Sequence, residues 1–595
     1  MDPSFQERIP VSGWERYCFD SLTKYLGDGL ENLTHGLTDK FGRPIFSLDN
    51  RTWGIDIETC NAYCSSDSLP WPNFNFSSFS SAFTNYLLPW LALTAQLPYE
   101  TGSPWSDIMS LCLAVGSPAL LGFSLTITML NRYWVRRELN LLIGSLRRET
   151  RKRYKRQINA VQYFLAEAQQ VPLQVPSDQD SLRRLLEPQM EVWWQGLNGR
   201  LRRSRRGVTA SLVAQALSAV IAYTFTVIAS FLTSIDSLDP VMEITAGTLW
   251  VWLIPVICGW VVVGTQSTHD AVEDALRIKH FDHSAEPQGD SDHQEPSFDG
   301  EESPISIRSN WNSNHSCWLG VNFAGDELQK GPVYNYARLF TWWQTANAFI
   351  QTSKSIALEH DAETEASWQT DRISKRKGSQ VLNMVSESEI SEIRIIHSER
   401  FATYPRFSNI PPDVWWRMVL ASIMAVTVQW GATGASILMA YLTPPGGLGC
   451  RSGSYALYGI FGTISWVALL VSMVLSHAAM ARPASPYGPA LLGRMAIMLR
   501  CGGRAVAVMN AAWLVVSTLF ENIGLYDSCW CHGVVLQRGG NAWVILFRTV
   551  EEFRHEAKNA WPGGIAFTMI VSTLMIVVFA LGSKGDSSSS DDEYE

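Results

Sequence analysis

Seven stretches of the chain are almost free of charged residues and are long enough to cross a lipid bilayer. About 20 residues of α-helix span the roughly 30 Å of hydrocarbon, and the backbone there must be helical because no water satisfies its polar groups. The pattern therefore predicts an all-α fold, a polytopic bundle of about seven transmembrane helices. The stretches are 108–130, 208–233, 245–265, 418–442, 454–480, 505–520 and 563–581.

An eighth apolar run, 82–98, is interrupted by Asn85, Pro89 and Gln96. Two arrangements accommodate it. If the N-terminus lies outside, the chain has seven spans and this run enters the membrane without crossing it. If the N-terminus lies inside, the run is an eighth span. Among the seven spans, 505–520 is the shortest, and we expect Arg504 to extend back to the lipid headgroups beside it.

Loop charges orient the chain in the membrane. The loops 131–207 and 481–504 are rich in arginine, and the positive-inside rule places both in the cytosol. Alternation then puts 235–243, 443–453 and 521–562 outside. Glycosylation sequons at Asn32, Asn50 and Asn75 favour an outside N-terminus. We therefore prefer the seven-span chain, in the plasma membrane or an endomembrane of the secretory pathway.

Cysteines gather in the segments that this topology places outside, where disulfides persist. Cys529 and Cys531 are too close in sequence to pair easily with each other, so each is expected to bond to a distant cysteine. The candidates are Cys450 and the pair Cys60 and Cys64. The Cys529–His532 segment lacks the usual spacing of zinc ligands, so we expect no metal there.

Composition divides the chain into seven regions. These are an outside N-terminal region 1–81, a membrane segment with the first span 82–130, a basic cytosolic loop 131–207, a membrane hairpin 208–266, a cytosolic segment 267–412, a membrane bundle 413–582 that includes the outside loop 521–562, and an acidic disordered tail 583–595.

The cytosolic segment 267–412 is expected to be partly disordered. Its parts 280–310 and 359–379 are polar and poor in apolar residues, which predicts disorder. Between them, Tyr336, Phe340, Trp343 and Ile350 follow one helical stripe and predict a packed helix. A short helix is expected around Ile390–Ile396.

The basic loop predicts a helix whose cations could contact anionic lipids. The alternative is that these charges only fix the topology. The candidate lipid-contacting residues are Arg151, Lys152, Arg153, Lys155 and Arg156.

Chemical motifs are absent from the sequence. A net charge of −9 argues against a nucleic-acid binder. No ionisable residue lies deep in a span, and the polar residues there are the amides Gln215, Gln429 and Asn510, which typically bond neighbouring helices. Without a hydrolase, metalloprotease or phosphate-binding motif, we expect no catalytic residue and no cofactor. An enzyme is therefore the less favoured class.

Small residues repeat every four positions in the second span, at Ala210, Ala214, Ser218 and Ala222. Such stripes let helices approach closely, within one bundle or between two copies of a chain. The lipid bilayer and a second copy of the chain are thus the expected partners.

Segments 88–98 and 521–531 and the Gly116-Ser117-Pro118 sequence resemble parts of large multi-pass membrane proteins of filamentous fungi that have no assigned activity. The resemblance implies a fungal source and a multi-pass fold, and it implies no function.

The sequence leaves three classes of function open. A channel, transporter or sensor is slightly preferred, because it would use kinked spans and an ordered outside region. A non-catalytic membrane scaffold or trafficking protein is the main alternative, and an unrecognised membrane enzyme is the third.

Overall fold

The computed structural model describes part of the 595-residue chain. The described residues are 8, 13–26, 35–48, 51–64, 76, 79–80, 83, 87–97, 101, 103–174, 179–204, 209–232, 239–263, 269–276, 306–307, 317–318, 321–374, 404–481, 488–549, 552 and 560–583.

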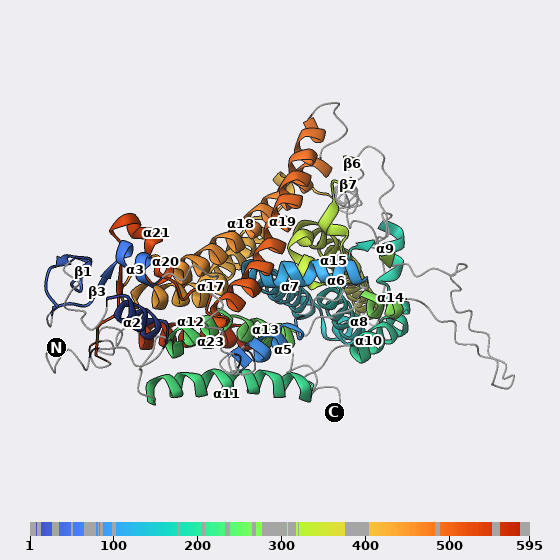
Figure 1. The fold of residues 1–595 in the computed structure, drawn as a ribbon. Helices are drawn as coiled ribbons and strands as arrows, with labels where there is room; N and C mark the ends of the chain where they lie inside the picture. The colour runs from blue at the N-terminus through green and yellow to red at the C-terminus, as the bar shows by residue number, and fades with distance from the viewer. Residues whose placement is uncertain are drawn as a thin grey trace.

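Long apolar helices form an elongated bundle (Figure 1). Six of them, among the described residues, are long and apolar enough to cross a membrane, which is compatible with an integral membrane protein. They are α11 (Ala210–Leu232), the pair α12 (Asp239–Leu249) and α13 (Leu253–Val263), α17 (Pro412–Leu442), α18 (Cys450–Met480), α19 (Gly488–Asn522) and α23 (Ala560–Ser583).

The predicted span 108–130 is not one straight helix. It consists of α6 (Pro104–Gly116) and α7 (Pro118–Ser145), which meet at an angle of 100°. Counting this pair as a single broken span raises the total from six to seven. The eighth run contributes α5 (Leu88–Thr94), whose seven residues rise only about 10 Å, a third of the hydrocarbon thickness.

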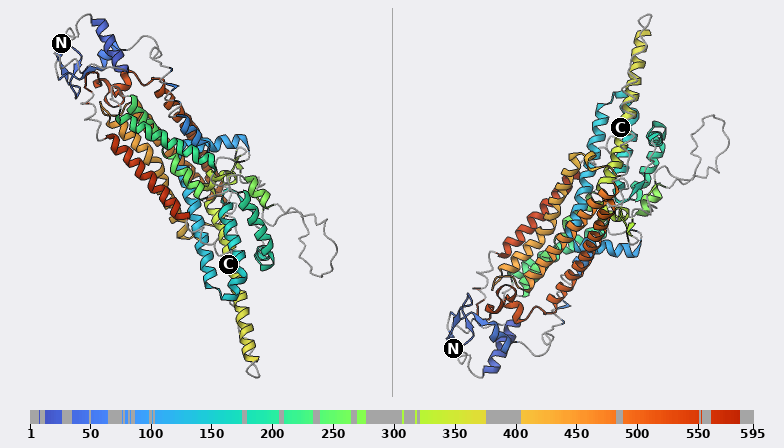
Figure 2. Two further views of the ribbon diagram at one scale, coloured as in Figure 1. Left: turned by 90° about the horizontal axis from the view of Figure 1, so that it is seen from below. Right: turned by 90° about the horizontal axis from the view of Figure 1, so that it is seen from above.

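A folded cap covers one end of the bundle, opposite the tip of α15 (Figure 2). It combines N-terminal helices α2 (Gly13–Leu26) and α3 (Ile57–Tyr63) with the segment that follows α19. A small antiparallel sheet joins the two, in the order β2-β1-β3-β8, with Ile55 opposite Val544. Its strands are β1 (Leu37–Thr38), β2 (Pro44–Ile45), β3 (Gly54–Asp56) and β8 (Trp543–Ile545).

A second helical layer extends from the other end of the bundle. Here α7 continues past the membrane-length core and packs against α8 (Arg148–Glu167) and α15 (Leu339–Ser374), and α10 (Glu191–Ser204) packs against α8. The rings of Phe164, Trp194 and Phe349 contact one another in its core, in T-shaped and tilted arrangements. Phe340, Trp343 and Ile350 of α15 are buried, as their stripe predicts. Tyr336 is buried too, but it lies before the start of α15. The helix at 390–396 lies outside the described residues, as does most of 280–310.

Three predictions about the segments 481–504 and 359–379 are wrong. The loop 481–504 is largely helical, because α19 begins at Gly488 and runs for 35 residues. Arg504 does not extend to headgroups, because it pairs with Asp326 from the segment before α15. The segment 359–379 was expected to be disordered, yet α15 continues through it to Ser374. Two ion pairs hold the first residues of this segment, one from Glu359 to Arg183 and one from Asp361 to Arg147.

Helix α11 lies on the outside of the bundle. Only 11% of the residues in its apolar stretch are buried. Ala210, Ala214 and Ser218 of its small-residue stripe are exposed. A homo-oligomer built on this stripe stays a prediction.

Candidate functional site

The break between α6 and α7 is the most unusual feature of the bundle core. Pro118 lacks an N–H and disfavours helical geometry at the preceding residue, and Ser117 is accordingly non-helical, with φ −142° and ψ 78°. Proline at the first position of α7 is well suited to start a helix. The Gly116-Ser117-Pro118 sequence therefore ends one helix and begins the next.

The break lies beside the middle of α17, deep in the bundle. Helix α7 runs antiparallel to α17, so that Ala119 meets Gln429 near the middle of α17 and Asn131 meets Arg417 near its start. Gln429 and Ser117 are fully buried. If α17 crosses the membrane, the non-helical backbone of the break lies well inside the hydrocarbon layer.

Side chains from three neighbouring helices bond the backbone groups that the break leaves open. Gln429 Oε1 on α17 accepts from the Ala119 amide at 3.2 Å. Asn510 Nδ2 on α19 donates to the Gly116 carbonyl at 2.7 Å. The Tyr458 hydroxyl on α18 donates to the Val115 carbonyl at 2.8 Å. Such replacement bonds are what a broken helix in lipid requires.

Gln429 Nε2, Thr433 Oγ1 and Asn510 Oδ1 have no hydrogen-bond partner among the described residues. All three residues are fully buried. An unmade bond on a buried polar atom costs about 1–3 kcal/mol. The site thus holds spare donor and acceptor capacity, all of it uncharged.

Helix packing around the break is close. A Cβ atom on Gly116 would lie 1.9 Å from the Ala507 carbonyl oxygen of α19, and one on Gly462 would lie 2.8 Å from Gln429 Oε1. Gly116 therefore lets α19 approach the break, and Gly462 of α18 leaves room for the Gln429 side chain of α17.

Of the three amides singled out in the sequence, the structure brings two together. Gln429 and Asn510 both reach the break. Gln215 lies on the outer helix α11 and donates to Ser211 Oγ at 3.3 Å.

A short segment packs beneath the break, on the side away from the cap. It comprises the 3-10 helices η6 (Gly325–Leu328) and η7 (Pro332–Arg338). Ser124 Oγ of α7 donates to the Val333 carbonyl at 2.9 Å, and Asn335 Nδ2 donates to Thr128 Oγ1 at 2.7 Å. The space beside it, between Asp326 and Ser476, measures about 10 Å³, enough for at most one water molecule.

Hydrogen bonds from Arg338 hold this segment in place. Arg338 is buried, and it donates to the carbonyls of Gln169, Glu327, Gln329 and Gly331 and to Asn335 Oδ1. Burial lowers the pKa of the guanidinium to about 9, so it stays protonated at neutral pH.

Asp326 links the segment to α19. Its carboxylate contacts the guanidinium groups of Arg500 and Arg504 and accepts from the Tyr336 hydroxyl. Burial raises the pKa of Tyr336, and the neighbouring carboxylate acts in the same direction. The sequence did not predict this cluster, because Arg500 and Arg504 were explained by the positive-inside rule and needed no acidic partner. The lone acidic residues of the 321–338 segment were the available signal.

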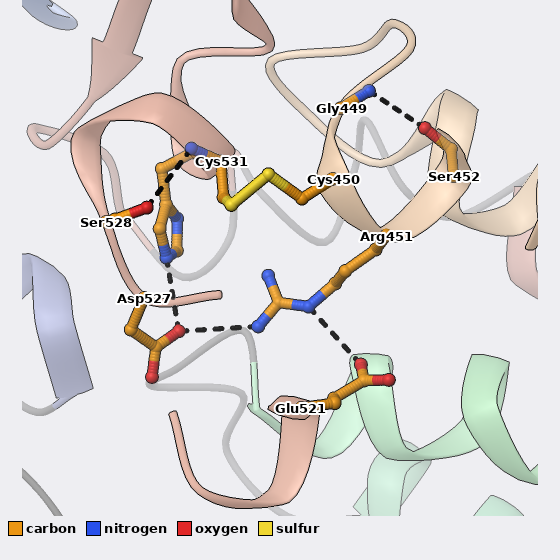
Figure 3. The surroundings of a disulfide bond; sticks show 9 residues. Gly449, Cys450, Arg451, Ser452, Glu521, Asp527, Ser528 and Cys531 are labelled. Carbon is orange, nitrogen blue, oxygen red and sulfur yellow. Dashed lines mark hydrogen bonds and ion pairs between the residues drawn. A yellow bond between two sulfur atoms is a disulfide. The ribbon is translucent and has the colours of Figure 1, made fainter. Parts of the chain in front are cut away.

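The cap contains a second cluster of charged residues (Figure 3). Arg451 lies between Glu521 and Asp527, at 3.2 and 3.3 Å, beside the disulfide between Cys450 and Cys531. His532 Nε2 donates to Asp527 Oδ1 at 3.3 Å. Burial alone would raise the pKa of Asp527, but the His532 hydrogen bond and the Arg451 charge together bring it below the usual 3.8.

We expect this cluster to stabilise the cap above about pH 4 and to lose that effect as the pH falls through the lowered pKa of Asp527, because the folded state then must bind a proton. The Asp527→Asn variant should therefore show a shallower fall in melting temperature between pH 5 and pH 3 than the wild type. Asp20→Asn, at an exposed carboxylate of the same cap, is the control. Equal slopes in the wild type and in Asp527→Asn would contradict the assignment.

Of the six cysteines that the sequence places outside, five lie in the cap and the sixth, Cys450, begins α18 beside it. They form three disulfides: Cys18–Cys64, Cys60–Cys529 and Cys450–Cys531. Cys529 and Cys531 each bond to a distant cysteine and not to each other. Cys112, Cys258 and Cys501 are free. The sequon residues Asn32, Asn50 and Asn75 lie outside the described residues.

The five basic residues of the candidate lipid contact are exposed on α8. Helix α8 folds back along α7, with Glu167 beside Arg132 and Arg151 beside Ile143. The five basic residues therefore lie about 16 Å further from the bundle than Arg132 does. This distance is about two Debye lengths at physiological salt, so their attraction to lipid headgroups near Arg132 would be largely screened. Contact with anionic lipids stays a prediction, and the topological role requires no such contact.

No known protein family, curated protein or solved structure matches this chain.

Proposed function

We propose that the protein is a membrane transporter in which the broken helix α6–α7 takes part in moving a small, uncharged polar solute. The observation that carries the proposal is the helix break itself, set in the bundle core with spare hydrogen-bonding atoms from α17 and α19 around it. Transporters commonly use discontinuous helices at mid-membrane to bind solutes.

The chemistry of the break favours a neutral solute. Its open atoms are an amide nitrogen, an amide oxygen and a hydroxyl, from Gln429, Asn510 and Thr433. Together these atoms could hydrogen-bond a solute that carries both hydrogen-bond donors and acceptors. Arg504, six residues before Asn510 on α19, is paired with Asp326.

In this proposal the structure corresponds to a closed state of the transporter. Gly116 lies against Ala507, so α6 must separate from α19 before a solute can reach the break. Helix α6 ends at the break and joins α7 through residues with no helical bond across them, so it can tilt without unwinding α7.

The cap would then lie outside and the basic helices in the cytosol. Three disulfides in the cap support this orientation, because they persist in an oxidising compartment.

A non-catalytic scaffold is the second candidate. The close contacts of Gly116 and Gly462 favour it, because they are typical of a bundle that stays closed.

Thiol accessibility separates the two candidates. The test uses a chain in which Cys112, Cys258, Cys317 and Cys501 are replaced by alanine. A transporter exposes the break to water for part of the time, so Ser117→Cys should react slowly with a membrane-impermeant maleimide in sealed vesicles. Ile423→Cys, on the exposed apolar face of α17, should stay unreactive in lipid, and Ser145→Cys at the end of α7 should react fast from one side.

The outcome at position 117 decides the matter. If Ser117→Cys is as unreactive as Ile423→Cys from both sides over hours, the break stays dry and the scaffold is the better assignment.

A further inference from the structure

Two of the disulfides in the cap lie in contact with each other. The sulfur atoms of Cys18, Cys60 and Cys64 are all within 4.8 Å of one another, although Cys18 bonds to Cys64 and Cys60 bonds to Cys529. Cys60 lies on α3, Cys64 caps that helix one turn later, and Cys18 comes from α2. Among the described residues, no other group of cysteines brings three sulfur atoms this close.

The Cys60–Cys529 bridge is a long-range link. It joins residues 469 positions apart and ties the N-terminal helices to the segment between α19 and α23. Non-covalent contacts cross the same boundary: β3 pairs with β8, Arg548 pairs with Glu15 at 2.9 Å, and Trp14 stacks on His532. The two parts can therefore stay together when the bridge opens.

Solvent reaches these four residues unequally. Cys18 and Cys60 are completely buried, whereas Cys64 and Cys529 retain about 4% exposure each. An external thiol is therefore limited to the edges of the cluster, and Cys60 can be attacked only by a sulfur that is already inside it.

We propose that these four cysteines form a thiol–disulfide exchange site, in which reduction of Cys18–Cys64 is passed on to Cys60–Cys529. A small dithiol attacks Cys64 Sγ, and Cys18 leaves as the thiolate. The second thiol of the reagent then releases Cys64 and forms a cyclic disulfide, so that two electrons have entered the protein.

The exchange itself needs no further reductant. The Cys18 thiolate attacks Cys60 Sγ, the Cys18–Cys60 bond forms, the Cys60–Cys529 bond breaks, and Cys529 leaves as a thiolate that takes up a proton. The products are one disulfide, Cys18–Cys60, and two thiols, on Cys64 and Cys529. The covalent link between the two parts of the cap is lost.

The third disulfide provides the internal contrast. Cys450–Cys531 is flanked by Arg451, Asp527 and Ser528 (Figure 3), and neither of its cysteines belongs to the cluster of three sulfurs. It should therefore not take part in the exchange.

The test uses the full-length protein in detergent, with the thiols alkylated at acid quench and the disulfides mapped by non-reducing peptide analysis. In Cys64→Ser the free Cys18 thiol should exchange, so that alkylated Cys529 rises about tenfold above the wild type and a Cys18–Cys60 peptide appears. In Cys531→Ser, which frees Cys450, alkylation of Cys529 should stay at the wild-type level.

The wild type gives a second measurement that needs no variant to fold. During titration with dithiothreitol, the first thiols to appear should be Cys64 and Cys529. If Cys18 and Cys64 appear together while Cys60–Cys529 stays intact, or if Cys64→Ser retains Cys60–Cys529 with Cys18 alkylated, the exchange site does not exist.

Discussion

Replacing Gly116 by alanine is expected to destabilise the protein by about 3 kcal/mol, at the upper end of the usual cost of overpacking. The added Cβ would lie 1.9 Å from the carbonyl oxygen of Ala507, a backbone atom that cannot rotate away. Either α6 must move off α19 or the break must distort, and both disturb the bond from Asn510 to the Gly116 carbonyl. Thermal unfolding in detergent micelles, followed by tryptophan fluorescence, measures the loss.

Gly434→Ala on α17 is the matched control, because a Cβ there would meet no atom within 4 Å. It should leave the melting temperature unchanged or raise it slightly. If both alanine variants unfold at the wild-type temperature, α6 and α19 do not pack at Gly116 as described. In the accessibility experiment, Gly116→Ala should also make Ser117→Cys react faster, because the closed state is selectively weakened.

Replacing Arg338 by methionine is expected to cost more, about 3–5 kcal/mol. Methionine fills most of the space but donates no hydrogen bond, so four backbone carbonyls and Asn335 Oδ1 lose their donor inside the protein. Unmade bonds of this kind cost about 1–3 kcal/mol each, and local rearrangement recovers part of the sum. The effect should concentrate in the 325–338 segment, where amide hydrogen exchange should accelerate before global unfolding.

Arg153→Met is the control, because Arg153 is exposed on α8, and changes at such sites usually stay within about 0.5 kcal/mol. Arg338→Lys should recover only part of the stability, because an ammonium group cannot reach all five acceptors at once. An Arg338→Met protein with unchanged melting and unchanged exchange in 325–338 would show that the segment is held by other contacts.

Hydrophobic patterning was sufficient to predict the all-α bundle and most of its long helices, because a helix that faces lipid must be apolar over its whole length. It also separated the two ends of the molecule. The cysteines predicted to lie on one side meet in one cap, and the arginine-rich helices extend from the other end. Both features depend on local composition, which a single sequence displays directly.

Contacts between distant segments were decided only by the tertiary structure. The sequence identified Gln429 and Asn510 as polar residues in spans. Their bonds to Ala119 and Gly116, on the two sides of the break, depend on how the helices pack, over separations of more than 300 residues. Arg500 and Arg504 looked like loop charges because their partner, Asp326, lies 174 and 178 positions away. The Asp326 carboxylate neutralises two arginines that an isolated span could not easily bury. The pairing of Cys60 with Cys529, and its contact with Cys18, follows in the same way from the packing of α2, α3 and the last loop.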